Sequence, residues 1–266
     1  MSASRISIIV TTFNSPGALR WVLGALANQT LLPVEVIVAD DGSVTETREI
    51  IDQLRCSFPC RLFHSWQTDS GFRLSRSRNL AVLKATGDWL IFLDGDCVMP
   101  ENFLSVHQKI ISQNCLINCS RKLLSREITG QLISSDFDKS ALTRYCSGRK
   151  FLSLPLGFLR DYPVRSWRLL RGFFISVDRI LFEKIAGFDE AYSSWGLEDS
   201  DFAVRALRSG GRLRDGRYSS AVLHLWHSEN GDGPSPSNAS NFQSLLISKR
   251  QESTCSLYLE ESESVQ

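Results

Sequence analysis

Two carboxylates separated by a glycine, Asp94-Gly95-Asp96, follow directly after an apolar run at residues 89–93. Carboxylate oxygens bind hard divalent ions, and the missing side chain of the glycine leaves room for phosphate oxygens to approach. An ion held there would neutralise a departing diphosphate while its bond breaks. The same tripeptide is typical of ordinary surface turns. The buried strand expected immediately before it favours the metal-binding interpretation.

A second acidic pair, Glu198 and Asp199, follows Trp195 at the expected start of a helix. A carboxylate in such a position would take the proton from an acceptor hydroxyl. The positive end of the helix dipole favours carboxylates, which also makes acids common in the first turn of helices without any catalytic role. Trp195 favours a site, because the face of an aromatic ring can stack on a sugar ring.

Two of the four histidines, His224 and His227, end the last expected strand. A neutral imidazole would suit a manganese-like ion as a further protein ligand. Histidines at strand ends are more often structural than ligands. Because two of the four histidines lie here, the ligand interpretation is nevertheless favoured for His227, whereas it is disfavoured for His224.

Polar residues also follow two other apolar runs. Thr11, Phe13 and Asn14 come after residues 6–10, and Asp41 comes after residues 34–39. Asp41 could accept the N3–H of a uracil or another base, but a turn with a helix cap explains it equally well. Thr11 and its neighbours could likewise form only a strand exit. Arg78 is expected to pair with a phosphate group.

The elements that must position these residues alternate along the first half of the chain. Apolar runs at 6–10, 34–39, 61–64 and 89–93 predict strands, and the segments between them predict helices ending near residues 28, 55 and 85. This alternation predicts an α/β fold with a mostly parallel, doubly wound sheet. Ligands bind such sheets outside the carboxyl ends of the strands, so we expect the polar residues to meet in one cleft.

The second half of the chain has weaker patterns. Residues 121–171 are basic and loop-rich, and the stretch 144–171 interleaves arginines with aromatic residues. Strands are expected at 173–177 and 221–224, with helices at 178–186 and 198–208. Residues 231–266 are polar and become acidic, so we expect a poorly packed tail.

The composition excludes several classes of protein. The 266 residues are 42% hydrophobic and 22% charged with a net charge of +1, which indicates a globular protein and no general attraction to nucleic acid. No apolar run reaches the roughly 18 to 20 residues that span a bilayer, and the first residues lack the apolar region of a signal peptide. Seven cysteines without zinc-type spacing fit free thiols in a reducing cytoplasm.

Taken in order, five motifs resemble those of family 2 glycosyltransferases with the GT-A fold. They are residues 7–14 (SIIVTTFN), 38–43 (VADDGS), 77–79 (SRN), 94–96 (DGD) and 195–199 (WGLED). The later half is similar to the galactosyltransferase-like C-terminal part of bacterial chondroitin-type synthases and of β-1,4-galactosyltransferases. The resemblance covers about residues 5–230 and implies an inverting transfer from a nucleotide-diphosphate sugar, usually UDP-linked, with Mn2+ or Mg2+.

The resemblance also implies roles for the candidate residues. Residues 1–120 would form a nucleotide-sugar-binding half, and 121–230 would form the acceptor-binding and catalytic half of the same domain. Asp96 and His227 would hold the metal, Asp199 would be the general base, and Glu198 would orient the acceptor. The nucleotide-sugar-binding residues would be Thr11, Phe13, Asn14, Asp41, Arg78, Asp94, Gly172 and Trp195.

Two departures from the family pattern bear on function. Processive members carry Gln-x-x-Arg-Trp, which residues 165–168 do not match, so a processive synthase is not expected. The usual Gly-Gly-Glu-Asp is Gly196-Leu197-Glu198-Asp199 here, so we expect a differently shaped acceptor pocket. Two alternatives remain open at this point. One is a non-catalytic nucleotide-sugar-binding module. The other, less favoured, is a sugar-nucleotide pyrophosphorylase, which should carry a Gly-rich basic loop after the first strand.

The expected partners are a UDP-sugar donor and a saccharide or lipid-linked saccharide acceptor. Transfer of a hexose or N-acetylhexosamine would serve the synthesis of a cell-surface glycan such as lipopolysaccharide or capsule, by analogy alone. The stretch 144–171 has two equally weighted interpretations. It would either contact anionic lipid at the inner face of the cell membrane or form a solvated insertion that covers the core. No nucleic-acid partner is expected.

Overall fold

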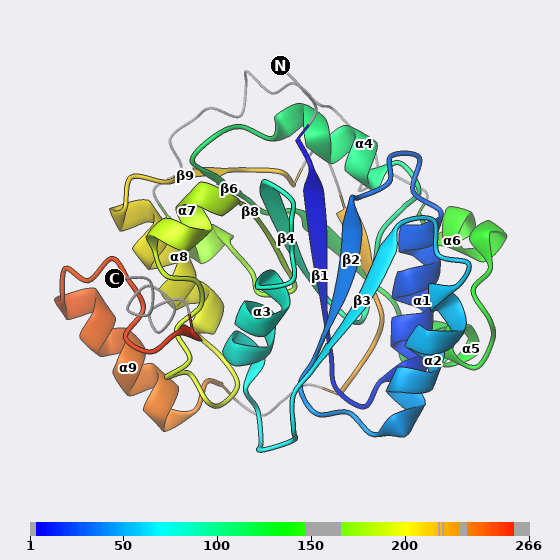
Figure 1. Ribbon diagram of the computed structural model, residues 1–266, viewed down its shortest axis with the longest axis horizontal. Coiled ribbons are helices and arrows are strands. Elements are labelled where there is room, and N and C mark those ends of the chain that lie inside the picture. The colour runs from blue at the N-terminus through cyan, green and yellow to red at the C-terminus, as the bar shows by residue number, and fades with distance from the viewer. Residues whose placement is uncertain (1–3, 147–165, 218, 220, 229–232, 258–266) are drawn as a thin grey trace.

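Within the residues that the structure describes, seven strands form a sheet at the centre of the protein (Figure 1). The computed structural model describes residues 4–146, 166–217, 219, 221–228 and 233–257, and its strand order is β3-β2-β1-β4-β8-β6-β9. The four strands β1 to β4 are parallel, β8 is antiparallel to β4 and β6, and β6 is parallel to β9. The strands are β1 (Ile6–Thr12), β2 (Glu35–Asp40), β3 (Arg61–Trp66), β4 (Trp89–Asp94), β6 (Cys115–Ile117), β8 (Phe174–Asp178) and β9 (Arg212–Arg214).

The central strands consist largely of residues that suit burial on both faces. Every residue of β1, β2 and β8 is buried, as expected for Ile- and Val-rich strands covered by helices on each side. The strands predicted in the first half are confirmed, and β3 continues to Trp66. The strand predicted at 173–177 is present as β8 and is antiparallel to β4. Asp94 N donates to the Phe173 carbonyl at 3.1 Å, which joins the start of β8 to the carboxyl end of β4.

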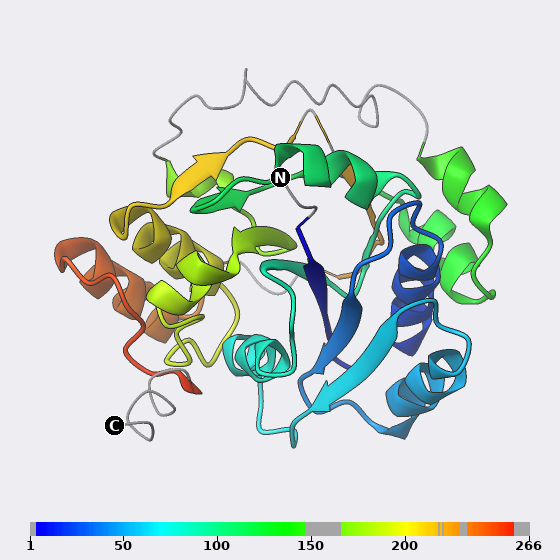
Figure 2. The same ribbon diagram turned by 45° about the horizontal axis from the view of Figure 1, so that its top comes forward.

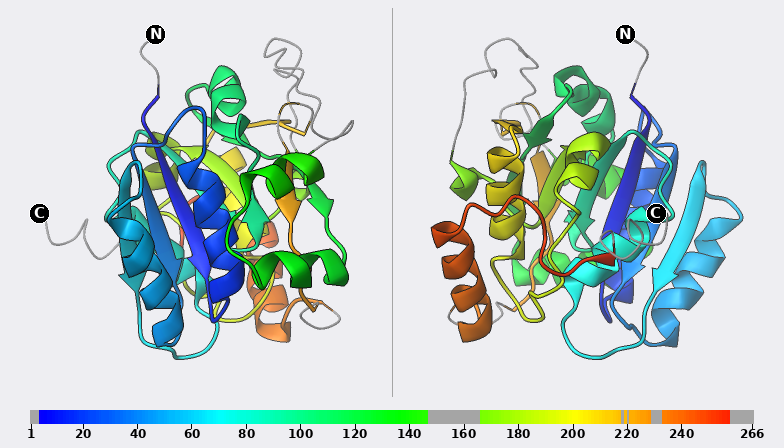
Figure 3. Two further views of the ribbon diagram at one scale, coloured as in Figure 1. Left: turned by 90° about the vertical axis from the view of Figure 1, so that its right-hand side faces the viewer. Right: turned by 60° about the vertical axis from the view of Figure 1, so that its left-hand side comes forward.

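Helices cover both faces of the sheet (Figures 1 and 3). One core joins the sheet to α1, where Trp21 and Leu23 are buried, and the other joins it to α7 and α8 through Phe182 and Phe202. Helix α4 lies near the start of β1, away from the edge where β1, β2 and β4 end (Figure 2). The helices are α1 (Pro16–Ala27), α2 (Thr45–Arg55), α3 (Leu74–Val82), α4 (Phe103–His107), α5 (Arg126–Ile133), α6 (Lys139–Tyr145), α7 (Arg179–Lys184), α8 (Glu198–Arg208) and α9 (Pro236–Ile247), with short 3-10 turns at Gln108–Ile110 and Trp167–Leu169.

A second sheet begins directly after Asp96. Its three strands are β5 (Cys97–Val98), β10 (Ala221–His224) and β7 (Ser120–Leu123), in the order β5-β10-β7. β10 pairs with both neighbours, so the strand that ends in His224 lies next to the segment that follows the two aspartates. This small sheet therefore places the end of β10 beside Asp96.

The segment expected to be loop-rich contains regular structure in its first part. Helices α5 and α6 occupy residues 126–133 and 139–145, and α5 packs against α1. Residues 147–165, which make up most of the basic stretch 144–171, lie outside the described residues. Within the described ranges, no helix combines the length and apolar character needed to cross a bilayer.

The prediction of a poorly packed tail at 231–266 is wrong for the part that the structure describes, 233–257. Helix α9 buries Phe242 and Leu245 against a cluster that includes Val204 of α8. Arg250 then pairs with Asp189 at 2.5 Å and with Asp201 of α8 at 3.1 Å. Only two apolar residues in a stretch rich in Ser and Asn face the core, which is too weak a pattern to predict a helix from sequence.

Candidate active site

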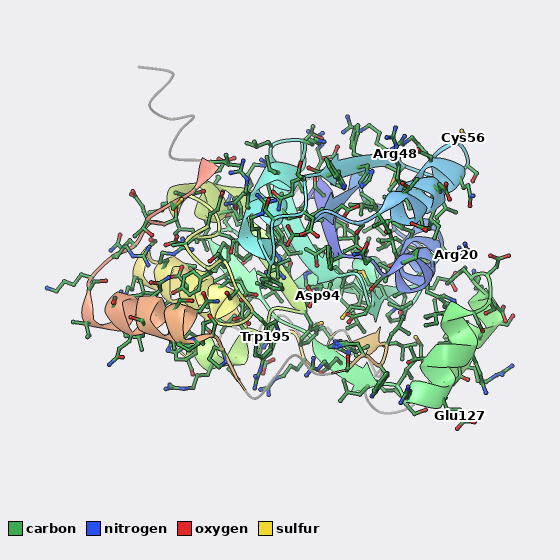
Figure 4. The ribbon with its side chains drawn as sticks, turned by 90° about the horizontal axis from the view of Figure 1, so that it is seen from below. Arg20, Arg48, Cys56, Asp94, Glu127 and Trp195 are labelled. Carbon is green, nitrogen blue, oxygen red and sulfur yellow. The ribbon has the colours of Figure 1, made fainter. Side chains whose placement is uncertain are left out.

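The carboxyl ends of β1 and β4 bring the first predicted residues into contact. Thr11 and Asp94 are register partners, and Thr11 Oγ1 donates to Asp94 Oδ1 at 3.1 Å. Gly95 packs closely against the end of β1. A Cβ at this position would lie only 2.3 Å from the Thr11 carbonyl oxygen, so a larger residue would not fit. Seen from this edge, Asp94 and Trp195 both appear in the central part of the view (Figure 4).

Asp96 faces His224, the last residue of β10, and His227, three residues beyond it. His227 Nε2 lies 3.3 Å from Asp96 Oδ2, and His224 Nε2 lies 3.7 Å from Asp96 Oδ1. Leu225 N donates to the Asp96 carbonyl at 2.9 Å and holds this segment in place. The structure therefore brings together the predicted pair Asp96 and His227. It also places His224, which was disfavoured from the sequence, almost as close.

The hydrogen bonding of His227 fits a metal ligand. Its Nδ1 lies 2.9 Å from the Ser228 carbonyl oxygen, which can only accept, so the proton is on Nδ1. Nε2 then presents a lone pair to the Asp96 carboxylate, and two acceptors at 3.3 Å repel unless a proton or a cation lies between them. Burial and then the nearby Asp94 raise the pKa of Asp96 to about 6, while His227 opposes the shift. These residues fit a divalent ion, with Asp94 alongside.

Asp199 lies at the amino end of α8, next to the chain segment that precedes β8. Its Oδ1 accepts from Ser200 N at 2.6 Å, which leaves Oδ2 for other contacts. A Cβ at Gly172 would lie 3.3 Å from that Oδ2, so a larger residue there would crowd the carboxylate. The predicted pocket residue Gly172 and the predicted base are thus neighbours.

The turn before α8 contains two residues in the left-handed region. Gly196 has φ +97° and Leu197 has φ 74°. Leu197 stands where the family pattern has a second glycine, and it keeps a conformation that a glycine adopts without strain. Strain of this kind is typical of sites whose geometry the surrounding structure enforces.

Arg78 lies between Asp94 and Glu198, one residue from each acidic pair. Its side chain is fully buried, and Nη2 donates to Asp94 Oδ1 at 3.2 Å and to the Gly172 carbonyl at 3.0 Å. Nη1 lies 3.7 Å from Glu198 Oε1, and the guanidinium stacks on the Phe188 ring at 5.0 Å. The structure shows Arg78 paired with carboxylates of the protein, and the phosphate contact expected from the sequence stays a prediction.

We expect Arg78→Met to destabilise the protein by about 3 kcal/mol, the low end of the range for removing one partner of a buried ion pair, because Asp94 is 33% exposed. Met keeps the volume but leaves Asp94 and Glu198 without their cation. The urea midpoint followed by circular dichroism measures the change. Arg48→Met, at a position 73% exposed, is the matched control and should leave the midpoint unchanged. Equal midpoints for the two variants would contradict the assignment.

The environment of Glu198 favours its protonated form. Burial and then the charge of Asp199 raise the pKa of Glu198 from 4.5 to about 7, and Arg78 opposes this shift. Because the folded state holds this proton more tightly than the unfolded chain, the group contributes stability that is fully present below pH 4.5 and lost as the pH rises through about 7.

We therefore expect Glu198→Gln to be more stable than the wild type above pH 7, by on the order of 2 to 3 kcal/mol, with the difference vanishing towards pH 4.5. Unfolding free energies of both proteins between pH 4.5 and 8 measure it. Glu183→Gln, at a position 48% exposed, should show no such trend. A Glu198→Gln curve parallel to that of the wild type would rule out the raised pKa.

Asp41 is buried beside the end of β2 with both carboxylate oxygens engaged. Oδ2 accepts from Arg73 N at 2.7 Å, and Oδ1 accepts from Gln67 Nε2 at 2.5 Å. Burial raises the pKa of Asp41 despite these hydrogen bonds. Asp41 N donates to the Thr12 carbonyl, which places Asp41 next to the end of β1. Asp41 is at the predicted place, and it also anchors the loop before α3.

The loop after β1 is held against the loop after β2. Asn14 N donates to Ser43 Oγ at 2.9 Å, and Asn14 Oδ1 accepts from Val44 N at 2.9 Å. Phe13 is 49% exposed and Trp66, which donates through Nε1 to the Ser43 carbonyl, is 51% exposed. Trp66 was missed from the sequence, where the third strand was expected to end at residue 64. Asn14 has a structural role in these contacts.

Trp195 is 44% exposed, and the loop that carries it is held by the start of α9. Asn238 Nδ2 donates to the Ser194 carbonyl at 2.7 Å and to the Gly196 carbonyl at 2.8 Å. Ser235 N donates to the Trp195 carbonyl at 3.3 Å. The segment expected to be a loose tail therefore positions the loop that precedes the candidate base.

The mostly parallel sheet, with acids and histidines at its carboxyl edge, defines an α/β protein of the GT-A type. Residues 7–141 match the family described as Glycosyl transferase family 2, and residues 160–227 match the one described as N-terminal domain of galactosyltransferase. The chain belongs to glycosyl transferase family 2, as the motifs predicted.

Curated relatives agree with this family, and solved structures share its fold. The hyaluronan synthase of Pasteurella multocida is 31% identical over 229 residues, and the chondroitin synthase of Pasteurella multocida strain Pm70 is 27% identical over 229 residues. These matches cover 77% of this chain but only 23% of each relative. Staphylococcus aureus TarS 1-349 in complex with UDP has a TM-score of 0.66 at 19% identity, covering 94% of this chain and 67% of that one. The mannosyltransferase PcManGT from Pyrobaculum calidifontis with GDP-Man and Mn2+ has a TM-score of 0.57 at 18% identity, covering 83% and 56%.

Proposed function

We propose that the protein is an inverting, metal-dependent glycosyltransferase that moves a hexose or N-acetylhexosamine from a UDP-sugar to a saccharide acceptor. One observation carries the proposal. Asp96 and His227, which suit a divalent ion, share an edge of the sheet with Asp94, and Arg78 ties Asp94 to the start of the helix that carries Asp199.

The donor would bind along the loops that follow β1, β2 and β4. Phe13 would offer its exposed ring to the base, and Asp41, at the end of β2, donates through its backbone N to the carbonyl of the preceding Thr12. Asp94 would contact the ribose or the metal, and Gly172 would line the sugar pocket. When bound at Asp96 and His227, Mn2+ or Mg2+ would offset the negative charge of the diphosphate.

The proton transfer is assigned to Asp199. Its carboxylate would take the proton of the acceptor hydroxyl while the acceptor oxygen forms a bond to the anomeric carbon. The bond from that carbon to the diphosphate oxygen breaks, and UDP leaves with the electron pair. Attack from the side opposite UDP inverts the anomeric configuration. Glu198, with its raised pKa, would orient the acceptor by hydrogen bonding.

The acceptor is proposed from the relatives. Two of them are named for the synthesis of hyaluronan and chondroitin, which supports a saccharide acceptor and a role in cell-surface glycan synthesis such as lipopolysaccharide or capsule. The UDP in the TarS structure and the Mn2+ in the mannosyltransferase structure support the donor and the ion. A cytoplasmic position and contact of the stretch 144–171 with the inner face of the membrane are parts of the proposal that rest on sequence alone.

A donor screen tests this function. Purified protein with Mn2+ is offered UDP-Gal, UDP-Glc, UDP-GlcNAc, UDP-GalNAc and GDP-Man, and both thermal shift and release of the nucleotide are followed. We expect a UDP-sugar to be preferred and slowly hydrolysed. Stabilisation by UDP with Mn2+ but no hydrolysis or transfer of any donor would instead indicate a non-catalytic binding module.

A further inference from the structure

Cys97 lies beside the metal-suited residues and has no role in the proposed transfer. It occupies β5, directly opposite His224 of β10 in an antiparallel pair. Side chains of such partners emerge on the same face of a sheet with their Cβ atoms about 4.5 to 5.5 Å apart. Cys97 is fully buried and His224 is 7% exposed, so the thiol and the imidazole meet in a confined space.

The two oxygens of Asp96 serve different neighbours. Oδ2 faces His227, whereas Oδ1 lies 3.5 Å from Cys97 Sγ and 3.7 Å from His224 Nε2. The three ligand atoms of Asp96, Cys97 and His224 all lie within 4.8 Å of one another. Tetrahedral zinc, with bonds of about 2.0 to 2.3 Å, places its ligand atoms roughly 3.3 to 3.6 Å apart. Two of the three distances are already close to that spacing.

We propose that Asp96, Cys97 and His224 form a thiol-containing site for a thiophilic divalent ion such as Zn2+ or Co2+, which shares Asp96 with the site for Mn2+. Thiolate and imidazole ligands select such ions over Mn2+, which prefers oxygen ligands. On binding, the thiol releases its proton to solvent, so one thiolate and one carboxylate balance the double positive charge.

One neighbouring cation competes with an ion at this site. Arg121 Nη1 lies 3.5 Å from His224 Nε2, and because a guanidinium only donates, the lone pair of that nitrogen faces Arg121, so an ion bound there must displace this contact. Arg121 is held over the Phe173 ring at 5.0 Å, and its charge weakens cation binding without blocking the thiol. His227 lies on the other side of the Asp96 carboxylate.

A consequence is that the two kinds of ion compete. An ion on the Cys97 side of Asp96 engages the carboxylate that the Mn2+ site also uses. We expect Zn2+ to displace Mn2+ from the protein, which the electron paramagnetic resonance signal of released Mn2+ would report. This inference depends on the contacts around Asp96 and does not require the transferase function.

Cobalt titration of the purified full chain tests the site without any sugar donor. We expect one equivalent of Co2+ to produce a sulfur-to-cobalt charge-transfer band in the near ultraviolet. Cys97→Ser should lose the band and weaken Zn2+ binding by at least roughly 10- to 100-fold, the range already seen for residues that only support a ligand. His227→Ala should keep the band, and Asp96→Asn should lose it.

Cys119→Ser is the matched control, because Cys119 is another buried thiol near Cys97. It should keep the band, and circular dichroism checks the fold of every variant. A wild-type protein without the band, or a band that survives in Cys97→Ser, would overturn the proposal. The wild-type spectrum decides even where a variant fails to fold. Since no donor is present, failure here leaves the transferase proposal to its own test.

Discussion

Asp96→Asn is expected to lower sugar transfer by roughly 10²- to 10³-fold or more, the cost of losing one preorganised contact to developing charge. Asparagine keeps the shape of the side chain but removes the charge that faces His227 at 3.3 Å. Because the pKa of Asp96 is raised to about 6 by burial and by Asp94, the neutral amide should not destabilise the fold. Turnover with Mn2+, together with calorimetric binding of Mn2+–UDP, measures the effect.

The matched control is Asp136→Asn, the same change at a side chain that is 89% exposed and pairs only with Arg20 among the described contacts. It should transfer sugar at the wild-type rate and bind Mn2+–UDP normally. If Asp96→Asn retained both turnover and Mn2+-dependent binding of UDP, Asp96 would not be a metal ligand.

Asp199→Asn is expected to lower turnover by about 10²- to 10⁴-fold, the usual contribution of a general base, while Mn2+–UDP still binds. The change is nearly isosteric, so Gly172 keeps its place and the hydrogen bond from Ser200 N is retained by the amide oxygen. The reduction should appear in kcat, because an amide cannot accept the proton of the acceptor hydroxyl.

The pattern across the two variants separates their roles. Asp96→Asn should lose donor binding and turnover together, whereas Asp199→Asn should lose turnover alone. Full turnover by Asp199→Asn would refute the assignment of the base, and loss of UDP binding in that variant would place Asp199 on the donor side instead. Glu198→Gln in the same assays shows whether the neighbouring acid can replace it.

The sheet and its edge could be predicted because each depends on local pattern. Buried parallel strands are continuous runs of apolar residues, and the residue that follows each run must lie at the carboxyl edge. This reasoning located Thr11, Asp41 and Asp94, and the register partnership of Thr11 with Asp94 agrees with it. The family was predicted separately, from the resemblance of five ordered motifs to those of its members.

The partners of Arg78, the position of His224 and the packing of α9 could not be predicted, because they depend on contacts between residues far apart in sequence. Arg78 was expected at a phosphate, but the charges that hold it belong to residues 94 and 198, on other elements. His224 was disfavoured because histidines at strand ends are more often structural, and nothing local shows that β10 pairs with β5. The packing of α9 could not be predicted from the sequence, because Phe242 and Leu245 are buried by contacts with residues of other elements, among them Val204 of α8.

Proton nuclear magnetic resonance of donor hydrolysis tests the central claim most directly. Wild-type protein is mixed with Mn2+ and the preferred UDP-sugar, and the anomeric signals of the released sugar are followed before they equilibrate. We predict Mn2+-dependent release of UDP, with the sugar appearing first in the anomeric configuration opposite to that of the donor. Release of sugar that retains the donor configuration, or no release with any of the donors, would contradict the account.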